Sequence, residues 1–372
     1  MAGRPQHAYP ALDGMRGIAA LAVVFNHFPL AAQPALFRNG LLAVDIFFVM
    51  SGFVIASAYD AKLDQGFGAR SFMLARVIRL WPVLALGVAA GLAQALIAPV
   101  AGKDLPLGAD GRMVCAGFGL GFLPCPILPS EMFPTDPPAW SLFYELVANL
   151  LFALAFVPLL KAGRLATVIG AGGAVAASGV LHFHGATFGG GPHGVAFEFG
   201  RVGFSFFLGV LMHRTRARWS PHVPRLSPWM IYALLLALLA APTPRPLQAP
   251  VHLFGILIAS PLLVALGAQS PARGRLLDIS LTAGALSYPL YALHMPLMFL
   301  GRGLGADRRV PPALLDLTLA VGIASLAYLV ARFYEPLARR WMDAGLKGCS
   351  TNRQDKAARP MLTTRTAARS QE

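Results

Sequence analysis

Ten apolar stretches, each separated from the next by a short polar segment, constrain the fold of this chain more than any other feature. They lie at 14–30, 41–58, 76–99, 139–160, 165–182, 196–212, 228–241, 251–267, 279–300 and 312–334. A hydrocarbon core of about 30 Å is crossed by roughly 20 apolar residues in a helix. Inside lipid every backbone polar group needs an internal partner, which an α-helix provides. The pattern therefore predicts an all-α, polytopic membrane protein with about ten transmembrane helices.

The composition supports one membrane domain rather than several soluble ones. Charged residues make up 13% of the chain, against about 25% in a typical soluble domain. We expect the membrane domain to cover residues 1–346, followed by a disordered basic cytoplasmic tail over 347–372. The first stretch could instead be a signal peptide cleaved near Ala31–Ala32, although His27 would be unusual in such a peptide.

The net charge of +14 points to membrane topology rather than to nucleic acid, because the chain has no basic motif with interleaved aromatic residues. With the N-terminus inside and ten alternating spans, 23 of the 31 Lys and Arg residues fall on the inner side and eight on the outer side. Lys and Arg are enriched in cytoplasmic loops. We therefore expect both termini to be cytoplasmic in a multi-pass protein of the inner (plasma) membrane.

The segment 113–128 is apolar but is broken by several Gly and Pro residues. It is predicted to be a re-entrant segment or a short outer helix, since counting it as a span would reverse the charge bias of all later loops. Cys115 and Cys125 flank this segment, either as a disulfide or as two free thiols. The chain has no Cys pair with metal-ligand spacing, so we expect no metal site. A metal site at His182, His184 and His193 is only weakly indicated, because their spacing is irregular.

Ionisable residues inside apolar stretches are costly and are therefore functional candidates. Arg16 and His27 are eleven residues apart and share one helix face, about 16 Å apart along the axis. The second predicted span enters the membrane from the outer side, so we expect Asp45, near its start, to lie at the same membrane depth as His27. There it could orient the imidazole and stabilise its protonated form. The alternatives are a helix-packing hydrogen bond for His27 and a helix-start cap for Asp45.

Two arginines, Arg76 and Arg79, share one face at the inner end of the third predicted helix. Together with Arg16 they could bind phosphate or pyrophosphate groups, because a guanidinium pairs with phosphate through two hydrogen bonds. The alternative is ordinary anchoring of the helix end by positive charge.

Polar residues also recur in two later stretches. Ser141 and Glu145 share a face of the span that starts near 139, where Glu145 could bind acceptor hydroxyls, assist proton transfer, or pair with Arg201. Tyr291 and His294 share a face of the ninth span, which Pro289 and Pro296 are expected to kink. We therefore place Ser141, Tyr291 and His294 around a polar pocket.

These segments together resemble the acyltransferase 3 family of integral membrane O-acyltransferases. The resemblance runs from Tyr9 to Arg340 and depends on the order and spacing of several motifs. They are Leu12 to Gly17, Arg16 with His27, Asp45 to Phe53, Arg76 to Pro82, Trp140 to Glu145, and Ser287 to His294.

The resemblance implies transfer of an acyl group, often acetyl, to sugars, lipopolysaccharide, peptidoglycan or small molecules outside the cytoplasm. It implies that His27 is the catalytic base and that Arg76 and Arg79 lie on the donor side. Glu335 and Pro336 are adjacent here, whereas family members often have one residue between them, so Glu335 is not carried over. Some members carry a fused esterase-like domain. This chain is expected to act without one, alone or with a separate partner.

The expected reaction is direct transfer from cytoplasmic acyl-CoA, most simply acetyl-CoA, to a hydroxyl of a sugar or glycan. His27, Asp45 and Glu145 are the expected catalytic residues, acyl-CoA is a co-substrate, and no cofactor is expected to be permanently bound. A route through an acylated side chain remains open. The alternatives are a transporter or flippase of a glycan precursor, which the absence of an internal repeat weakens, and a non-catalytic partner of a glycan assembly complex.

Overall fold

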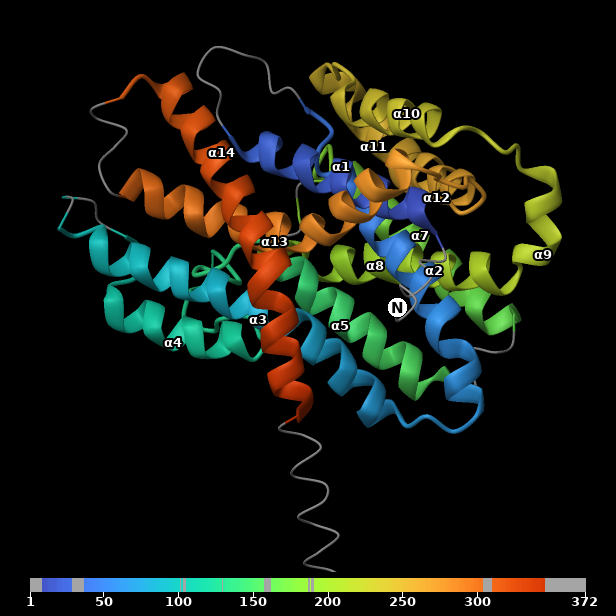
Figure 1. The fold of residues 1–372 in the computed structure, drawn as a ribbon, viewed down its shortest axis with the longest axis horizontal. Coiled ribbons are helices and arrows are strands. Elements are labelled where there is room, and N and C mark those ends of the chain that lie inside the picture. Colours follow the sequence, from blue (N-terminus) through green and yellow to red (C-terminus); the bar gives the residue numbers. More distant parts are fainter. Residues whose placement is uncertain are drawn as a thin grey trace, which may run out of the picture.

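The computed structural model describes residues 9–28, 37–100, 102, 105–128, 130–156, 162–186, 188, 191–303 and 310–344, and within them it contains helices and no strand (Figure 1). The helices are α1 (Pro10–His27), α2 (Leu42–Asp64), α3 (Ala69–Ile97), α4 (Ala109–Leu120), α5 (Ala139–Leu154), α7 (Ala162–His182), α8 (Val195–Arg214), α9 (Arg216–Trp219), α10 (Pro228–Ala240), α11 (Gln248–Phe254), α12 (Ser260–Gly267), α13 (Arg275–Gly303) and α14 (Pro312–Leu329). One π-helical turn, Gly255–Ala259, joins α11 to α12, and another, Val330–Tyr334, follows α14.

Each of the ten apolar stretches predicted from the sequence contains a helix. Seven helical segments of the described chain are long and apolar enough to cross a membrane: Leu42–Asp64, Ala69–Ile97, Gly163–His182, Pro192–Arg214, Arg245–Gly267, Arg275–Arg302 and Pro312–Ala344. Two shorter apolar helices, α5 and α10, and the 18-residue α1 correspond to the other three stretches. The chain is thus a multi-pass membrane protein, and the count of ten crossings stays a prediction. The predicted tail and the Ala31–Ala32 site lie outside the described residues.

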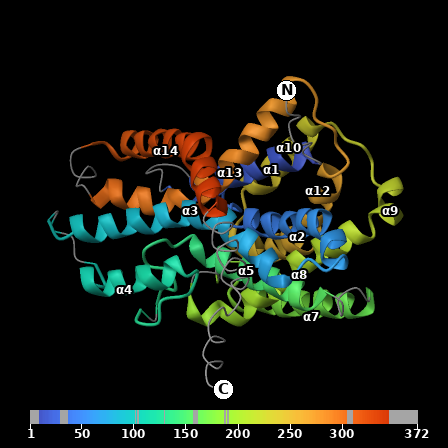
Figure 2. The same ribbon diagram turned by 60° about the horizontal axis from the view of Figure 1, so that its bottom comes forward.

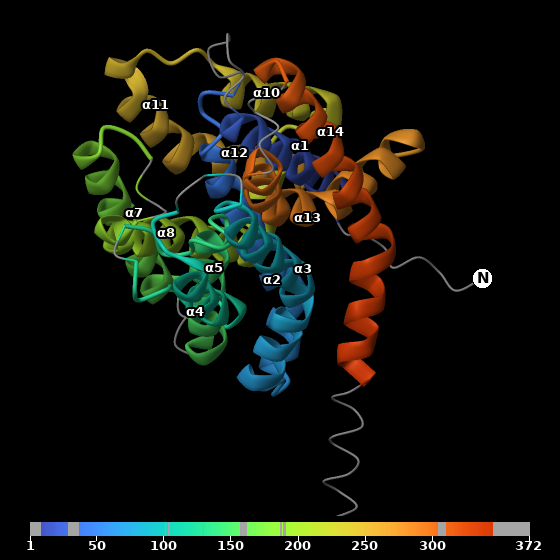
Figure 3. The same ribbon diagram turned by 90° about the vertical axis from the view of Figure 1, so that its left-hand side faces the viewer.

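The centre of the molecule is the group formed by α1, α2, α3, α5 and α13. In this group α13 contacts both α1 and α3. Outside it, α8 packs on α2, and α7 packs on α8. Figure 3 shows α7 and α14 on opposite sides of this group. Small residues allow the backbones to approach: Gly52 of α2 lies against the backbone of Phe206, and Gly209 of α8 lies against the backbone of Val49.

Helix α13 contains two prolines, Pro289 and Pro296, and bends along its length in Figure 2. A proline inside a helix has no N–H to donate and its ring crowds the preceding turn, so a bend there is expected. The bent region carries Tyr288, Tyr291 and His294, which therefore lie where α13 passes α1 and α3.

Helix α4 is too short to cross the membrane, since 12 residues span only about 18 Å. The indole N–H of Trp81, twelve residues into α3, donates to the carbonyl of Leu120 at the end of α4 (3.1 Å). The chain then returns through an irregular segment to α5. Irregular backbone at membrane depth is tolerated where protein covers it, and Phe122, Met132, Phe133 and Thr135 in this segment are buried.

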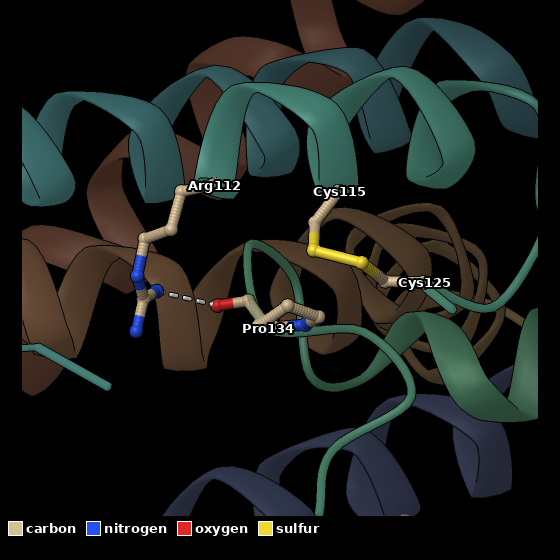
Figure 4. The surroundings of a disulfide bond; sticks show 4 residues. All are labelled: Arg112, Cys115, Cys125 and Pro134. Atoms are coloured by element: carbon tan, nitrogen blue, oxygen red, sulfur yellow. Dashed lines mark hydrogen bonds between the residues drawn. A yellow bond between two sulfur atoms is a disulfide. The ribbon is translucent and has the colours of Figure 1, made fainter. Parts of the chain in front are cut away.

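A disulfide between Cys115 and Cys125 ties α4 to the returning segment, and the guanidinium of Arg112 donates to the carbonyl of Pro134 at 2.8 Å (Figure 4). The sequence had left open whether these cysteines pair. Disulfides persist in oxidising compartments. The pairing therefore favours an extracytoplasmic location for the connection between α3 and α5.

This arrangement predicts the topology by cysteine labelling. With Cys349 replaced by Ser, Ala217→Cys in the short helix α9 should react only with a membrane-permeant maleimide. Leu247→Cys, before α11, should also react with an impermeant maleimide added outside. Cys115 and Cys125 should react with neither reagent until a reductant is added. Labelling of the 217 position from outside would mean that α4 crosses and that every later helix is inverted.

Candidate active site

A cavity opens where five helices meet. Arg16 comes from α1, Ser51 from α2, Arg76 and Arg79 from α3, Ser141 and Glu145 from α5, and Tyr288 and Tyr291 from α13. Apolar side chains of α2, among them Phe47 and Phe48, form much of the remaining wall. Six residues predicted from the sequence as site residues, Arg16, Arg76, Arg79, Ser141, Glu145 and Tyr291, thus line one cavity, although they come from four separate helices.

One ion pair organises the polar wall of this cavity. Glu145 Oε1 accepts hydrogen bonds from Arg76 (3.1 Å) and from the Ser51 hydroxyl (2.6 Å). Arg76 is buried, and a buried guanidinium without a carboxylate would be costly. The pair joins α2, α3 and α5 at one level. This corrects one expectation: Glu145 pairs with Arg76 and not with Arg201.

The cavity wall carries an excess of positive charge. Three arginines and one glutamate line it. Arg16 lies 3.5 Å from Asp13, one turn earlier on α1. Arg79 is exposed and forms no ion pair with any described residue, while its backbone carbonyl accepts from Arg339, which also pairs with Glu335. A wall of this charge suits a ligand with several negative charges.

Tyrosines of α13 form the opposite wall. The Tyr291 hydroxyl is 2.7 Å from the Ser141 hydroxyl, and Ser141 also donates to the carbonyl of Pro138 (3.1 Å). Because a serine has a single hydroxyl proton, the Tyr291 O–H donates to Ser141 when Ser141 donates to Pro138. The Tyr291 ring packs edge-on against Phe47, with ring centroids 5.7 Å apart. Tyr288 donates to the carbonyl of Leu80 at 2.5 Å.

Two histidines meet beside Tyr291, outside the residues that line the cavity. His27 Nδ1 is 2.8 Å from the carbonyl of Val23, and His294 Nδ1 is 2.7 Å from the carbonyl of Tyr291. His294 Nε2 is 3.3 Å from His27 Nδ1. The structure thus corrects the placement of His294: it does not line the cavity but contacts the His27 ring.

Asp45 does not contact His27, which corrects the pairing expected from the sequence. Both of its carboxylate oxygens accept from Arg201, from Nε at 2.8 Å and from NH2 at 2.6 Å. It does not cap α2 through its side chain either. Arg201 also donates to Glu198 at 3.0 Å and to the carbonyl of Leu41 at 3.1 Å. Asp45 is therefore part of a buried network that joins the beginnings of α2 and α8.

Several buried polar residues were not recognised in the sequence. Glu198 is three residues before Arg201 on α8, and this spacing is a signal that could have revealed the pair. The His252 Nδ1 accepts from the backbone N–H of Ala186 at 2.9 Å, a contact that no local pattern indicates. Asp136 lies in the segment before α5 and beside Gly87 of α3, and burial raises its pKa well above the usual range.

Known proteins similar to this chain include acyltransferases. A family profile described as "Acyltransferase domain" matches residues 9–332. A Rhizobium radiobacter protein named "Protein 2 in picA locus" is 39% identical over 166 residues, which cover 41% of this chain and 85% of that protein. No solved structure matches the chain.

Two further relatives are similar over shorter segments. The Bacillus subtilis protein named "Putative peptidoglycan O-acetyltransferase YrhL" is 38% identical over 81 residues, or 20% of this chain and 12% of that protein. A Staphylococcus aureus protein named "Putative O-acetyltransferase" is 35% identical over 91 residues, or 24% of this chain and 14% of that protein. The chain therefore matches only a small part of the length of these two relatives.

The family match covers all the helices that form the cavity and the histidine pair, from α1 through α13. It fits a multi-pass helical protein with a cationic intramembrane cavity. This chain belongs to the acyltransferase 3 family, and it is a membrane acyltransferase.

Proposed function

We propose that this protein transfers an acyl group, in the first instance acetyl, from cytoplasmic acyl-CoA to a hydroxyl of an extracytoplasmic sugar or glycan. The observation that carries the proposal is the cavity wall with three arginines and a single carboxylate. Coenzyme A carries three phosphates and is present in the cytoplasm. A wall that carries more positive than negative groups inside a membrane protein suits such a ligand better than a neutral one.

The cavity suggests how the donor would lie. Arg79 is exposed, and Arg76 is buried one turn nearer the start of α3, so the two guanidinium groups would contact the phosphates from the same wall. Glu145 holds Arg76 in place, which leaves its other guanidinium donors available to the ligand. The acyl-pantetheine arm would then extend toward Tyr291 and Ser141. His294 packs beside Tyr291 and contacts His27, so the arm would approach the histidine pair.

The hydrogen bonds of His27 suit a general base. A carbonyl can only accept, so the contact with Val23 assigns the ring proton to Nδ1 and leaves a lone pair on Nε2. Nε2 would take the proton of the acceptor hydroxyl as its oxygen bonds to the thioester carbonyl carbon. The carbon–sulfur bond then breaks, and His27 returns the proton to the thiolate sulfur. General base catalysis typically contributes about 10²–10⁴-fold.

The relatives support a sugar acceptor and an acetyl donor. The Bacillus subtilis relative is named for O-acetyl transfer to peptidoglycan, and the Staphylococcus aureus relative for O-acetyl transfer. We extend this to a cell-surface polysaccharide, lipopolysaccharide or related glycan as the acceptor here. The disulfide and the distribution of Lys and Arg support a bacterial plasma membrane with donor entry from the cytoplasm.

The proposal is tested with purified protein in lipid vesicles. Acetyl-CoA is supplied on the side of the vesicle membrane that corresponds to the cytoplasm, at the start of α3. Extracted cell-surface glycan is supplied on the other side. We expect thiol release that depends on the glycan, and acetyl ester on the glycan. Movement of a glycan precursor across the vesicle without thiol release would identify a transporter instead.

Replacement of His27 tests the base. His27→Ala should lower kcat by at least about 100-fold, because the lost general base normally contributes that much. Binding of acetyl-CoA, measured by calorimetry, should stay within about twofold of wild type, because His27 does not line the cavity. Turnover above a few per cent of wild type would show that another group removes the proton.

Replacement of Arg79 tests the donor site. Arg79→Ala should weaken acetyl-CoA binding by about tenfold or more, the effect of one hydrogen bond to a charged group. Arg79→Lys should restore only part of the affinity, since Lys lacks the planar fork. Arg70→Ala is the matched control, because Arg70 is an exposed arginine of α3 that does not line the cavity.

The same assay applied to Arg76→Lys separates donor binding from folding, because Lys retains a positive charge beside Glu145. We expect weaker acetyl-CoA binding with unchanged affinity for the glycan. Equal affinity for acetyl-CoA in the Arg76 and Arg79 variants and in wild type would place the donor elsewhere.

A further inference from the structure

Two imidazoles from helices far apart in the sequence meet beside the cavity. His27 is the last residue of α1, and His294 lies in the bent part of α13 between Pro289 and Pro296. Their ring centroids are 5.0 Å apart, with the ring planes tilted by 52°. His294 is almost completely buried, with 1% of its surface exposed, whereas His27 is partly exposed.

The backbone contacts of the two rings assign their protons. His27 Nδ1 faces the carbonyl of Val23, and His294 Nδ1 faces the carbonyl of Tyr291, so each Nδ1 carries a proton in the neutral ring. His294 Nε2 therefore has a lone pair, and it lies 3.3 Å from His27 Nδ1. The His27 Nδ1–H is thus shared between Val23 and His294.

We propose that His294 is the positioning residue of His27: its Nε2 accepts the His27 Nδ1–H, holds the His27 ring with Nε2 free, and stabilises the imidazolium that forms during transfer. The assignment rests on the proposed acyl transfer with His27 as base. It replaces Asp45, whose two oxygens are occupied by Arg201.

The protons and bonds balance with His294 neutral throughout. The acceptor hydroxyl gives its proton to His27 Nε2 as its oxygen bonds to the acyl carbon. His27 is then an imidazolium, and its Nδ1–H makes a charge-assisted hydrogen bond to His294 Nε2. As the carbon–sulfur bond breaks, the proton on His27 Nε2 passes to the thiolate, and both rings are neutral again.

The buried position of His294 explains why an imidazole serves better than a carboxylate. A carboxylate with 1% exposure and no cation beside it would be costly to bury within the membrane. Among the described residues, no Asp or Glu carboxylate lies within 4 Å of a ring nitrogen of His294 or His27. A neutral imidazole can accept the same hydrogen bond, and it leaves the pair uncharged before the reaction begins.

Substitutions at His294 test the hydrogen bond. His294→Phe keeps a ring but removes the acceptor, and should lower kcat by about 10- to 100-fold, the factor for one hydrogen bond to a charged group. The KM for acetyl-CoA should not change. His294→Gln places an amide oxygen near the former Nε2 and should recover most of kcat. A kcat of His294→Phe within twofold of wild type, or equal losses in the Phe and Gln variants, would overturn the proposal.

His252→Gln is the matched control. His252 is also buried and also contacts the backbone through Nδ1, but it belongs to the outer network around Arg201. Its kcat should equal that of wild type. A loss in this variant as large as in His294→Phe would show that any buried imidazole matters, and would overturn the specific role of His294.

A spectroscopic measurement decides the geometry without activity. Protein labelled with ¹⁵N-histidine in lipid should show His294 Nε2 unprotonated and coupled through the hydrogen bond to His27 Nδ1, with signals assigned from His27→Gln and His294→Gln. A protonated His294 Nε2, or no coupling, overturns the proposal even if wild type is active. Coupling in a protein that transfers no acyl group would instead overturn the proposed function and leave the histidine hydrogen bond standing.

Discussion

The cost of burying charge in a membrane determines how the polar residues of this protein are arranged. A charged side chain in hydrocarbon needs a partner of opposite sign or access to water. Arg201 meets this need with Asp45 and Glu198, Arg214 with Asp60 at 2.8 Å, and Arg302 with Asp316. Each of these pairs joins two different helices or two turns of one helix. The pairs therefore also align the helices, although a buried ion pair is by itself weak evidence of added stability.

The cavity is where this compensation is incomplete. Glu145 pairs with Arg76 and Asp13 with Arg16, but Arg79 forms no ion pair with a described residue and leaves the wall positive. The same reasoning that explains the other pairs supports the proposed donor site, since the missing negative charge would come from solvent or from a bound anion. The apolar side chains of α2 that complete the wall make its surroundings less polar, which would strengthen a hydrogen bond between an arginine and a phosphate there.

Much of the helix arrangement follows from the apolar pattern, because a span of about 20 residues is a long and redundant signal. The interhelical pairs do not follow from it. Residue counting predicts Asp45 at the depth of His27, but a depth leaves the rotation of α2 open, and in the structure Asp45 faces Arg201. Glu145 could equally have paired with Arg201, and only the packing of α5 against α2 and α3 shows that it meets Arg76 and Ser51.

The separation between the arginines and the histidines has a chemical reason. Phosphate binding needs fixed positive charge, whereas a general base works best where its protonated form is not repelled by neighbouring cations. Tyr291 lies between the two regions: its ring borders the cavity, its hydroxyl is tied to Ser141, and its carbonyl holds His294. One residue of the bent part of α13 thus links the wall that would bind the donor to the imidazole pair that would activate the acceptor. Pro289 and Pro296 bracket Tyr291 and His294, so the part of α13 that joins the two regions is also the part in which a bend is expected.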